Sequence, residues 1–287
     1  MWTILKLLEW TTDYFAKHGI ESPRVDAELL LSHILKKKRI ELYLDFEKVV
    51  SENDLSSFKA LIQRRIKREP LQYITGEVNF YGITIKVTPD VLIPRPETEL
   101  LVEHVLQVTS HKSQVTILDL CTGSGCIIAA LAGKLPMARF VGVDISEAAL
   151  AIARENTERW KDRIELLCGD LFEPLLCNDL PQFDIIASNP PYVPEGELSS
   201  LQPEVRDFEP REALIAGKDG LEIIIKIINN AHNFLKPGGH LIMEIGDKEA
   251  DSVRRLIADT GHYNEPEVIR DYGGMERIIK VRNLWTN

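Results

Sequence analysis

The chain has 287 residues, 44% of them apolar, and a formal net charge of −10 at pH 7. This length is enough for one large domain or two ordinary ones with a sizeable core. Residues 1–70 hold 13 of the 34 Lys/Arg and 11 of the 44 Asp/Glu, so the other residues hold 21 and 33 and carry the negative excess. A body this acidic is a poor candidate for gripping a nucleic-acid backbone, and we expect no direct nucleic-acid substrate.

The composition also gives no reason to expect a membrane protein, a secreted protein or a metal site. The most apolar run of the C-terminal half, 221–228, is interrupted by Glu222 and Lys226, whereas a membrane span needs about 20 apolar residues. The N-terminal apolar run contains charges, so we expect no signal peptide. No Cys-x-x-Cys spacing occurs among Cys121, Cys126, Cys168 and Cys177. We therefore expect a cytoplasmic protein without a metal.

The first part of the chain has a helical pattern. Apolar residues recur three and four positions apart from Ile4 to Phe15, and two further segments repeat this spacing. We predict a small all-helical domain over residues 1–75. Beyond it, apolar residues alternate with polar ones around Gly82, which predicts a β-hairpin that links two domains over residues 76–95.

From residue 96 to residue 287, strand and helix patterns alternate. Short apolar runs predict strands at 115–119, 139–143, 164–168, 183–188 and 239–245. The segments between them, including 146–160 and 218–235, have helical periodicity. This order is typical of an α/β fold with a doubly wound, mostly parallel sheet. Two last strands, 266–270 and 276–282, flank a Gly-Gly turn and predict a C-terminal antiparallel hairpin at the sheet edge.

The ends of the first three of these strands carry residues suited to a nucleoside. Glycines 123 and 125 after the first strand allow a tight turn and close approach of a ligand. Asp144 ends the second strand, where its carboxylate can accept both ribose hydroxyls. Asp170 and Leu171 follow the third, where they suit an adenine. The cofactor contacts we predict are Cys121, Thr122, Gly123, Ser124, Gly125, Asp144, Asp170, Leu171 and Asn189. A simpler reading of Asp144 is that it neighbours the N-cap of the helix that opens at Ser146.

Two details favour a nucleoside without a pyrophosphate. The fingerprint Gly-x-Gly-x-x-Gly is incomplete, because the position three after Gly125 is Ile128. Asp119 places a negative charge beside the loop, which opposes a phosphate but suits a sulfonium and an ammonium group. A lone Gly-x-Gly remains weak evidence, and a nicotinamide-dependent dehydrogenase stays open as a distant alternative.

The tetrapeptide Asn189-Pro190-Pro191-Tyr192 follows the predicted strand 183–188. Two prolines make a stiff turn without backbone donors, so the carbonyl of Pro190 is presented as an acceptor. Asn189 adds a side-chain acceptor and Tyr192 adds a flat aromatic surface. Together they predict a clamp for a planar NH2 group. For the tetrapeptide alone, an ordinary Pro-rich turn is an equally good reading.

These motifs, in this order, resemble those of class I S-adenosylmethionine-dependent methyltransferases that alkylate an amide or amino nitrogen. The segments Ile93-Pro94-Arg95-Pro96-Glu97-Thr98-Glu99 and Phe208-Glu209-Pro210-Arg211-Glu212-Ala213-Leu214 are similar to those of the peptide-chain release factor glutamine methyltransferases. The resemblance covers nearly the whole chain. It implies a Rossmann-like catalytic domain over residues 96–287 and a substrate-recognition role for the helical domain. The family usually has Gly where this chain has Cys121.

The resemblance also implies the reaction. The methyl donor is S-adenosylmethionine, the product is S-adenosylhomocysteine, and the acceptor is the glutamine of the Gly-Gly-Gln motif in class I release factors. The implied catalytic residues are Asn189, Pro190 and Tyr192, with Pro191 also binding substrate. We expect a cytoplasmic monomer that acts in translation termination. The alternatives are an adenine-N6 nucleic-acid methyltransferase, a glutamine methyltransferase of a ribosomal protein, and a nucleoside-binding module without turnover.

Three charged groups have two readings each. Arg95 and Glu97 fit either a domain-linking ion pair or a place near the cofactor entrance. The basic runs 36–39 and 64–68 are most simply solvated helix faces. Their alternative role is contact with an acidic surface of the protein substrate.

Overall fold

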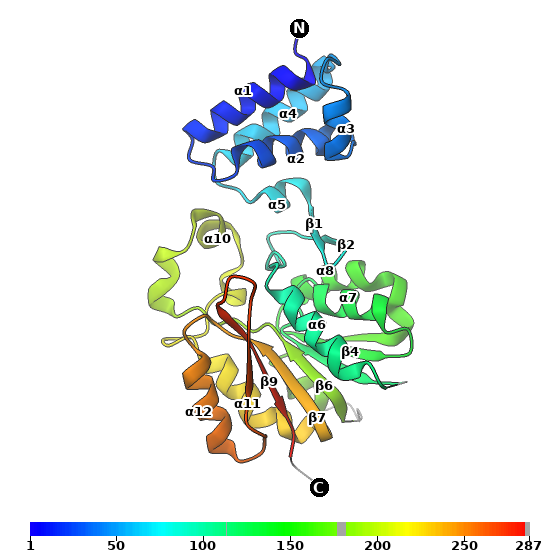
Figure 1. Cartoon of the computed structure of the whole chain (residues 1–287), viewed down its shortest axis with the longest axis vertical. Coiled ribbons are helices and arrows are strands. Elements are labelled where there is room, and N and C mark those ends of the chain that lie inside the picture. Colours follow the sequence, from blue (N-terminus) through cyan, green and yellow to red (C-terminus); the bar gives the residue numbers. More distant parts are fainter. Residues whose placement is uncertain (113, 177–181, 285–287) are drawn as a thin grey trace. The chain divides into compact units, whose positions relative to one another are not determined.

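The computed structural model describes residues 1–112, 114–176 and 182–284; Cys177 lies outside them. The chain divides into two compact units (Figure 1). The helical unit comprises Met1–Glu77 and Gln202–Phe208, and the sheet unit comprises Val78–Leu201 and Glu209–Asn287. The segment Gln202–Phe208 therefore belongs to the helical unit, although in sequence it interrupts the sheet unit. Every helix in the described part of the chain is too short or too polar to cross a bilayer.

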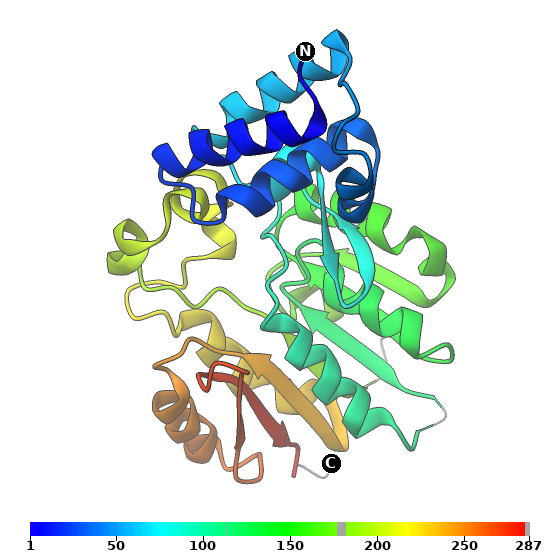
Figure 2. The ribbon, with the colours of Figure 1, turned by 45° about the horizontal axis from the view of Figure 1, so that its top comes forward.

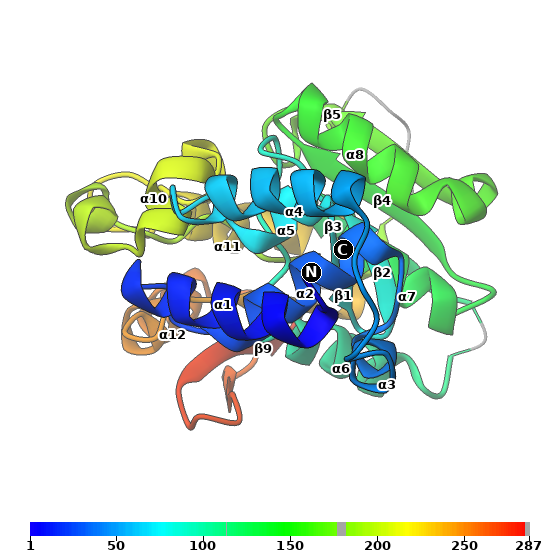
Figure 3. The same cartoon turned by 90° about the horizontal axis from the view of Figure 1, so that it is seen from above.

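The helical unit is built from amphipathic helices around one apolar core. Its helices are α1 (Ile4–Lys17), α2 (Pro23–Leu35), α3 (Arg39–Leu44), α4 (Glu52–Arg65), α5 (Leu71–Thr75) and α10 (Pro203–Phe208). Helix α2 packs along α1 and against α4 (Figure 3). The helices bury their apolar stripes there, including the rings of Phe15 and Phe58. Ser51 caps α4 by accepting a hydrogen bond from the backbone N–H of Asp54 at 3.2 Å.

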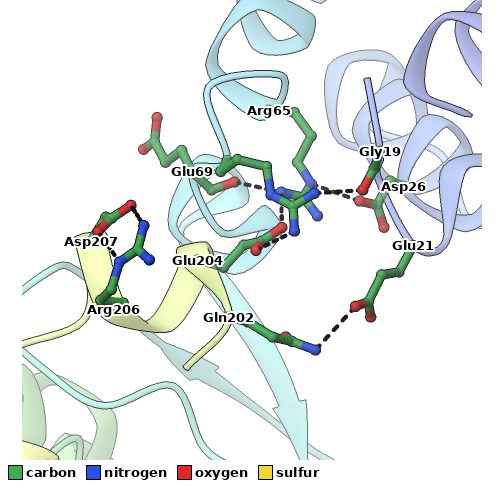
Figure 4. A network of polar contacts seen from close by, with 10 residues as sticks. Gly19, Glu21, Asp26, Arg65, Glu69, Gln202, Glu204, Arg206 and Asp207 are labelled. Carbon is green, nitrogen blue, oxygen red and sulfur yellow. Dashed lines mark hydrogen bonds and ion pairs between the residues drawn. The ribbon is translucent and has the colours of Figure 1, made fainter. Parts of the chain in front are cut away.

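The second basic run is a solvated face only in part. Arg65 is 7% exposed, and its guanidinium contacts the carboxylates of Asp26 at 2.7 Å and Glu204 at 3.0 Å (Figure 4). Arg68 donates to the other oxygen of Glu204 at 2.7 Å and to the carbonyl of Gly19. The solvated reading is wrong for Arg65, because two carboxylates on other elements hold it inside the unit.

Half of the remaining basic residues of the two runs are also ion-paired within the helical unit. Arg64 pairs with Glu69, Arg39 with Glu28, and Lys37 with Asp45. Within the two basic runs, the exposed lysines without a recorded ion pair are those at positions 36, 38 and 67. The basic surface that these two runs offer to a partner is therefore smaller than the sequence suggests.

The sheet unit contains the expected mostly parallel sheet. Its strands are β3 (Thr116–Leu120), β4 (Arg139–Asp144), β5 (Ile164–Cys168), β6 (Phe183–Ser188), β7 (Leu235–Glu244), β8 (Glu267–Arg270) and β9 (Glu276–Arg282). In the described residues their order is β5-β4-β3-β6-β7-β9-β8. The first five are parallel, and β9 runs antiparallel to both β7 and β8 (Figure 2). The predicted fold class is confirmed.

Helices cover both faces of this sheet. On one side α6 (Thr98–Thr109), α7 (Cys126–Lys134) and α8 (Glu147–Thr157) contact one another and the strands. On the other, α11 (Glu222–Phe234) and α12 (Ala250–Thr260) share a core with Leu118 and Leu120. Shorter elements are α9 (Glu173–Leu176) and the 3₁₀ turns η1 (Glu158–Arg163), η2 (Glu195–Ser200) and η3 (Arg211–Ala213). Because strand side chains alternate between faces, each layer has its own apolar set.

The predicted hairpin is present as β1 (Glu77–Phe80) and β2 (Ile83–Lys86), and β2 is fixed to α8. The backbone N–H of Lys86 donates to Asn156 Oδ1 at 2.8 Å, and Asn156 Nδ2 donates back to the Lys86 carbonyl at 3.0 Å. Strand β7 begins four residues earlier than predicted, because Leu235 pairs with Phe183 before a register irregularity. The Lys-Pro-Gly-Gly stretch after Leu235 hides this start in the sequence.

Candidate active site

The site lies where the strand order reverses. From β3 the chain passes to β4 on one side, whereas β6 pairs with β3 on the other. Ligands of doubly wound sheets bind beyond the carboxyl ends of the strands at such a point. Leu120 and Ser188 are partners at these ends, and Ser188 Oγ donates to the Leu120 carbonyl at 2.9 Å. Cys121 and Asn189, the next residues, therefore leave the sheet side by side.

A cavity of about 620 Å³ opens at this edge. Its volume is within the usual range for small-molecule sites, about 300–1,000 Å³. The predicted site residues that line it are Cys121, Gly123, Asp144, Asp170, Leu171, Asn189 and Pro191. Two segments outside the predicted cofactor set, Pro89–Leu92 and Pro210–Ile215, complete its wall. The loop Cys121–Gly125 and the proline corner, Asn189–Tyr192, thus face one cavity.

Other predicted residues support the cavity without lining it. Thr122 is 3% exposed, and its hydroxyl donates to Asp119 Oδ2 at 2.6 Å. Ser124 is also buried. Gly125 has φ +74°, and a Cβ there would lie 3.1 Å from that of Ala153, so glycine is needed for packing between α7 and α8. Pro190 and Tyr192 are likewise absent from the cavity wall.

Asp144 is held in place by the backbone. Its Oδ2 accepts from the N–H of Gly123 at 2.8 Å, and its Oδ1 accepts from the N–H of Ser146 at 2.9 Å. Burial raises the pKa of this carboxyl, and these backbone donors oppose the rise. Ser146 itself caps α8 by accepting from the N–H of Ala149. Since a carboxylate offers about four acceptor sites, Asp144 keeps capacity for ligand hydroxyls.

The two residues expected to meet an adenine differ in their surroundings. Asp170 forms an ion pair with Lys226 at 2.9 Å, and both side chains are partly exposed. Leu171 is buried and has φ +50°, in the left-handed region. The backbone at Leu171 is therefore strained, as is often found at ligand sites.

Asp119 lies behind the loop, fully buried. Desolvation raises the pKa of its carboxyl to about 7, although the Thr122 hydroxyl bond lowers it. Its Oδ1 has no hydrogen-bond partner among the described residues. Near pH 7 this carboxyl is therefore partly ionised, and it lies beside a cavity with acidic lining residues. Both features fit a cationic ligand better than a phosphate.

The proline-containing segments 93–99 and 208–214 are joined by an ion pair at Glu209. Arg95 donates to Glu209 Oε1 at 2.7 Å, and the glutamate is 6% exposed. Arg95 is thus paired within the sheet unit and not with Glu97. A bridge between Val193 and Ile215 returns the chain to the proline corner. This bridge places Pro210–Ile215 in the cavity wall, which sequence spacing alone could not show.

A hydrogen-bonded row of polar side chains lies behind the proline corner. Asn189 Nδ2 donates to Thr98 Oγ1 at 3.1 Å, and Thr98 Oγ1 donates to Glu244 Oε2 at 2.7 Å. The Tyr192 hydroxyl donates to Glu244 Oε1 at 3.1 Å. Burial raises the pKa of Glu244 to about 7 and also raises that of Tyr192. Sequence reasoning missed Thr98 and Glu244.

The described part of the chain has no candidate metal site. Within residues 1–112, 114–176 and 182–284, no group of three or more His, Cys, Asp or Glu side chains could hold a metal ion. Three cysteines of the same ranges, at positions 121, 126 and 168, are free thiols.

Comparison with known proteins gives matches over nearly the full length. The family model described as the PrmC N-terminal domain matches residues 6–76, and one described as a methyltransferase domain matches residues 111–277. A release factor glutamine methyltransferase of Geobacter sulfurreducens is 45% identical over 282 residues, covering 98% of this chain and 97% of that protein. One of Rhodopirellula baltica is 44% identical over 287 residues, covering 98% and 96%.

Solved structures show the same fold at low sequence identity. A methyltransferase from Pyrococcus furiosus superposes with a TM-score of 0.52 and 20% identity, covering 80% of this chain and 100% of that one. The catalytic domain of hMettl16 superposes with a TM-score of 0.57 and 17% identity, covering 72% and 77%. These likenesses concern the fold alone.

Proposed function

The chain belongs to the family of release factor glutamine methyltransferases, and from this premise and the site geometry we propose that it methylates a class I peptide-chain release factor. The donor is S-adenosylmethionine, and S-adenosylhomocysteine is the product. The acceptor is the side-chain amide nitrogen of the glutamine in the Gly-Gly-Gln motif. The protein is thus a protein-glutamine N-methyltransferase of translation termination.

One observation carries this proposal. The loop after β3 and the proline corner after β6 contribute to the wall of the same cavity, through Cys121 and Gly123 on one side and Asn189 and Pro191 on the other. A donor held by the loop and an NH2 group held by the corner would therefore share one enclosed space. Group transfer requires this proximity.

The cavity fits S-adenosylmethionine. Asp144 would accept the ribose hydroxyls, Asp170 and Leu171 would bind the adenine, and the loop from Cys121 to Gly123 would border the methionyl part. The buried Thr122, Ser124 and Gly125 would shape that loop from behind. The bound cofactor supplies a methyl group on a positively charged sulfur, and the acidic lining suits this charge.

The chain's own residues orient the acceptor. A carboxamide nitrogen is a poor nucleophile, because its lone pair is delocalised into the carbonyl. Asn189 Oδ1 and the Pro190 carbonyl would accept its two N–H bonds, and the Tyr192 ring would cover the amide plane. Orientation of this kind supplies up to about 7–11 kcal/mol. The same acceptors stabilise positive charge as it develops on nitrogen, and the methylated nitrogen then loses a proton to water without a dedicated base.

The helical unit is the proposed recognition element for the protein substrate. We also propose that the enzyme is a monomer and that it acts in the cytoplasm. Support comes from the free thiols, which suit a reducing compartment. The ion-paired arginines of the second basic run are unsuited to this task, since they already hold Glu204 and Asp26. Of the two basic runs, the exposed lysines at 36, 38 and 67 are the residues left for contact with an acidic surface.

Incubation with methyl-labelled cofactor and purified release factor tests the proposal. We expect one label per release factor, mapped by mass spectrometry to the Gly-Gly-Gln glutamine. Replacement Asn189→Ala removes one acceptor of the NH2 group. Turnover should become undetectable while the Kd for cofactor, measured by calorimetry, changes by less than about tenfold.

The matched control is Asn230→Ala, an exposed asparagine on α11 whose side chain bonds only the Lys226 carbonyl. It should retain wild-type turnover. Near-normal methylation by Asn189→Ala would refute the acceptor role of Asn189. Label found in DNA, or in a ribosomal protein instead of release factor, would refute the proposed substrate.

A further inference from the structure

The acceptor corner is connected to two buried residues far from it in sequence. Thr98 begins α6 and Glu244 ends β7, and each is 1% exposed. Three hydrogen bonds join Asn189 to Thr98, Thr98 to Glu244, and Glu244 to Tyr192. The first and last members of this row are the clamp residues themselves.

The ionised form of Glu244 fixes the direction of every bond in the row. In its ionised form, which prevails above about pH 7 because burial raises its pKa to about 7, Glu244 only accepts hydrogen bonds. In that form the hydroxyls of Thr98 and Tyr192 both donate to it. A threonine hydroxyl has one hydrogen, which is then used. Thr98 Oγ1 can therefore only accept from Asn189, and the NH2 end of Asn189 is the end that faces it.

This direction decides what Asn189 offers to a substrate. A primary carboxamide can rotate by half a turn and exchange its oxygen and its NH2 group. With the NH2 held by Thr98, Oδ1 is the free end; the described residues contain no recorded partner for it. The opposite orientation would present an NH2 group to the substrate's own NH2 group, and two donors do not bond.

The fold brings these residues together through strand register. Ser188 pairs with Met243 in the parallel ladder of β6 and β7, so Asn189 and Glu244 follow at the same level. Helix α6 packs on both strands and delivers Thr98. The charges of Arg277 and Glu97 also act on Glu244: Arg277 favours its ionised form and Glu97 opposes it.

We propose that Thr98 and Glu244 are positioning residues, which hold the Asn189 carboxamide with its oxygen toward the substrate NH2 group and anchor the Tyr192 ring. This inference rests on the proposed methyl transfer to an amide nitrogen. Neither residue touches substrate, and each acts through Asn189 or Tyr192.

The test uses the full-length enzyme with Thr98→Val, which keeps the side-chain shape and removes the hydroxyl. The kcat for release factor methylation should fall about 100-fold, the effect of misplacing a reacting group, while KM and cofactor Kd stay within about threefold. Thr98→Ser should recover at least a third of wild-type kcat. Thr109→Val, on the same helix, removes a buried hydroxyl that bonds only backbone carbonyls and should leave kcat unchanged.

A second measurement needs no turnover. The side-chain amide signal of Asn189, assigned in ¹⁵N spectra by its loss in Asn189→Ala, should exchange with solvent at least about tenfold faster in Thr98→Val than in wild type or Thr98→Ser. Equal exchange rates, a wild-type kcat in Thr98→Val, or an equal kcat loss in Thr98→Ser would overturn the positioning role. Failure of the wild-type enzyme to label release factor would instead overturn the proposed function, and the exchange measurement would still decide the orientation of Asn189.

Discussion

Cys121, where the family resemblance leads to an expected glycine, adopts φ +58°. A side chain in the left-handed region costs about 1–2 kcal/mol. The residue nevertheless lines the cavity proposed for the cofactor. Burial raises the pKa of its thiol, so the neutral thiol, a weak nucleophile, is the form that would face the methyl donor at its proposed position.

Substitutions at Cys121 should follow this backbone conformation. Cys121→Gly removes the strain but adds freedom to the unfolded chain, so the free energy of unfolding should change by less than about 1 kcal/mol. Cys121→Val places a β-branched side chain in the same conformation and should lower stability by about 1–3 kcal/mol. Urea denaturation measures both.

The control for this pair is Cys168→Val. Cys168 is exposed and lies in strand β5, where a β-branched residue is favoured. A loss of stability there as large as that of Cys121→Val would show that volume or chemistry, and not backbone conformation, explains the effect at Cys121.

Glu244 gives a pH-dependent prediction. Its pKa is about 7 in the folded protein because burial disfavours the charged form, against an ordinary value of about 4.3. Between these values the folded state binds more protons than the unfolded state, so this group's contribution to stability falls as pH rises to 7 and is flat above. The stability of Glu244→Gln relative to wild type should therefore increase from pH 5 to pH 8, by at most about 3 kcal/mol.

Urea denaturation of both proteins at several pH values checks this sign. Both share all other titrating groups, so the difference isolates Glu244 from its neighbours Arg277, Glu97 and Tyr192. A stability difference that is independent of pH would show that Glu244 is already ionised at pH 5 in the folded state.

At this scale, local motifs were sufficient for some residues and insufficient for others. Asn189, Gly123 and Asp144 could be placed at the cavity because each lies at the end of a recognisable strand or within three residues of it. Thr98 and Glu244 could not, since 146 positions separate them and only the β6–β7 register brings them together. Tyr192 was predicted only as a flat aromatic surface, yet its hydroxyl also donates a hydrogen bond to Glu244.

Among elements, apolar runs located strands well. The predicted β5 and β6 match the observed bounds, because both are short apolar runs between polar turns. The six-residue helix α10 was missed as a member of the helical unit. Its sequence is polar, and its attachment depends on ion pairs that span 139 and 136 positions, which no local pattern reveals.

The attachment of α10 can be tested at Glu204. Its carboxylate bonds both Arg65 and Arg68, and its side chain is 14% exposed. Glu204→Ala should lower the stability of the helical unit by about 1.5–3 kcal/mol, the range for hydrogen bonds to charged groups. Hydrogen exchange of residues 202–208 should accelerate in parallel.

Asp207→Ala is the control in the same segment. Among the described residues Asp207 has a recorded ion pair only with the adjacent Arg206, and both side chains are exposed (Figure 4), so its loss should leave the stability nearly unchanged. Equal effects of the two substitutions on hydrogen exchange would show that the ion pairs of Glu204 do not hold α10.

For the molecule as a whole, charge is divided as the chain is. The net charge of residues 1–70 is slightly positive, and that of the remainder is strongly negative. Yet Arg65 and Arg68 form their ion pairs with carboxylates of the helical unit itself. Reversing the whole run 64–68 would therefore break the unit's own structure, and substrate affinity is better probed at the exposed Lys67.

Deletion of Met1–Glu77 separates recognition from chemistry. The sheet unit keeps its strands, its main core cluster and every residue of the cavity wall. We expect the truncated protein to unfold cooperatively and to bind cofactor within about tenfold of wild type. The segment 202–208 loses its partners and should become sensitive to proteolysis.

Activity should then depend on the substrate offered. A short Gly-Gly-Gln peptide needs only the corner at Asn189, so its kcat/KM should change by less than about tenfold. For full-length release factor, kcat/KM should fall at least about 100-fold, which corresponds to about 2.7 kcal/mol of lost binding. An equal loss for peptide and protein would contradict a recognition role and would mean that the helical unit is needed to organise the site itself.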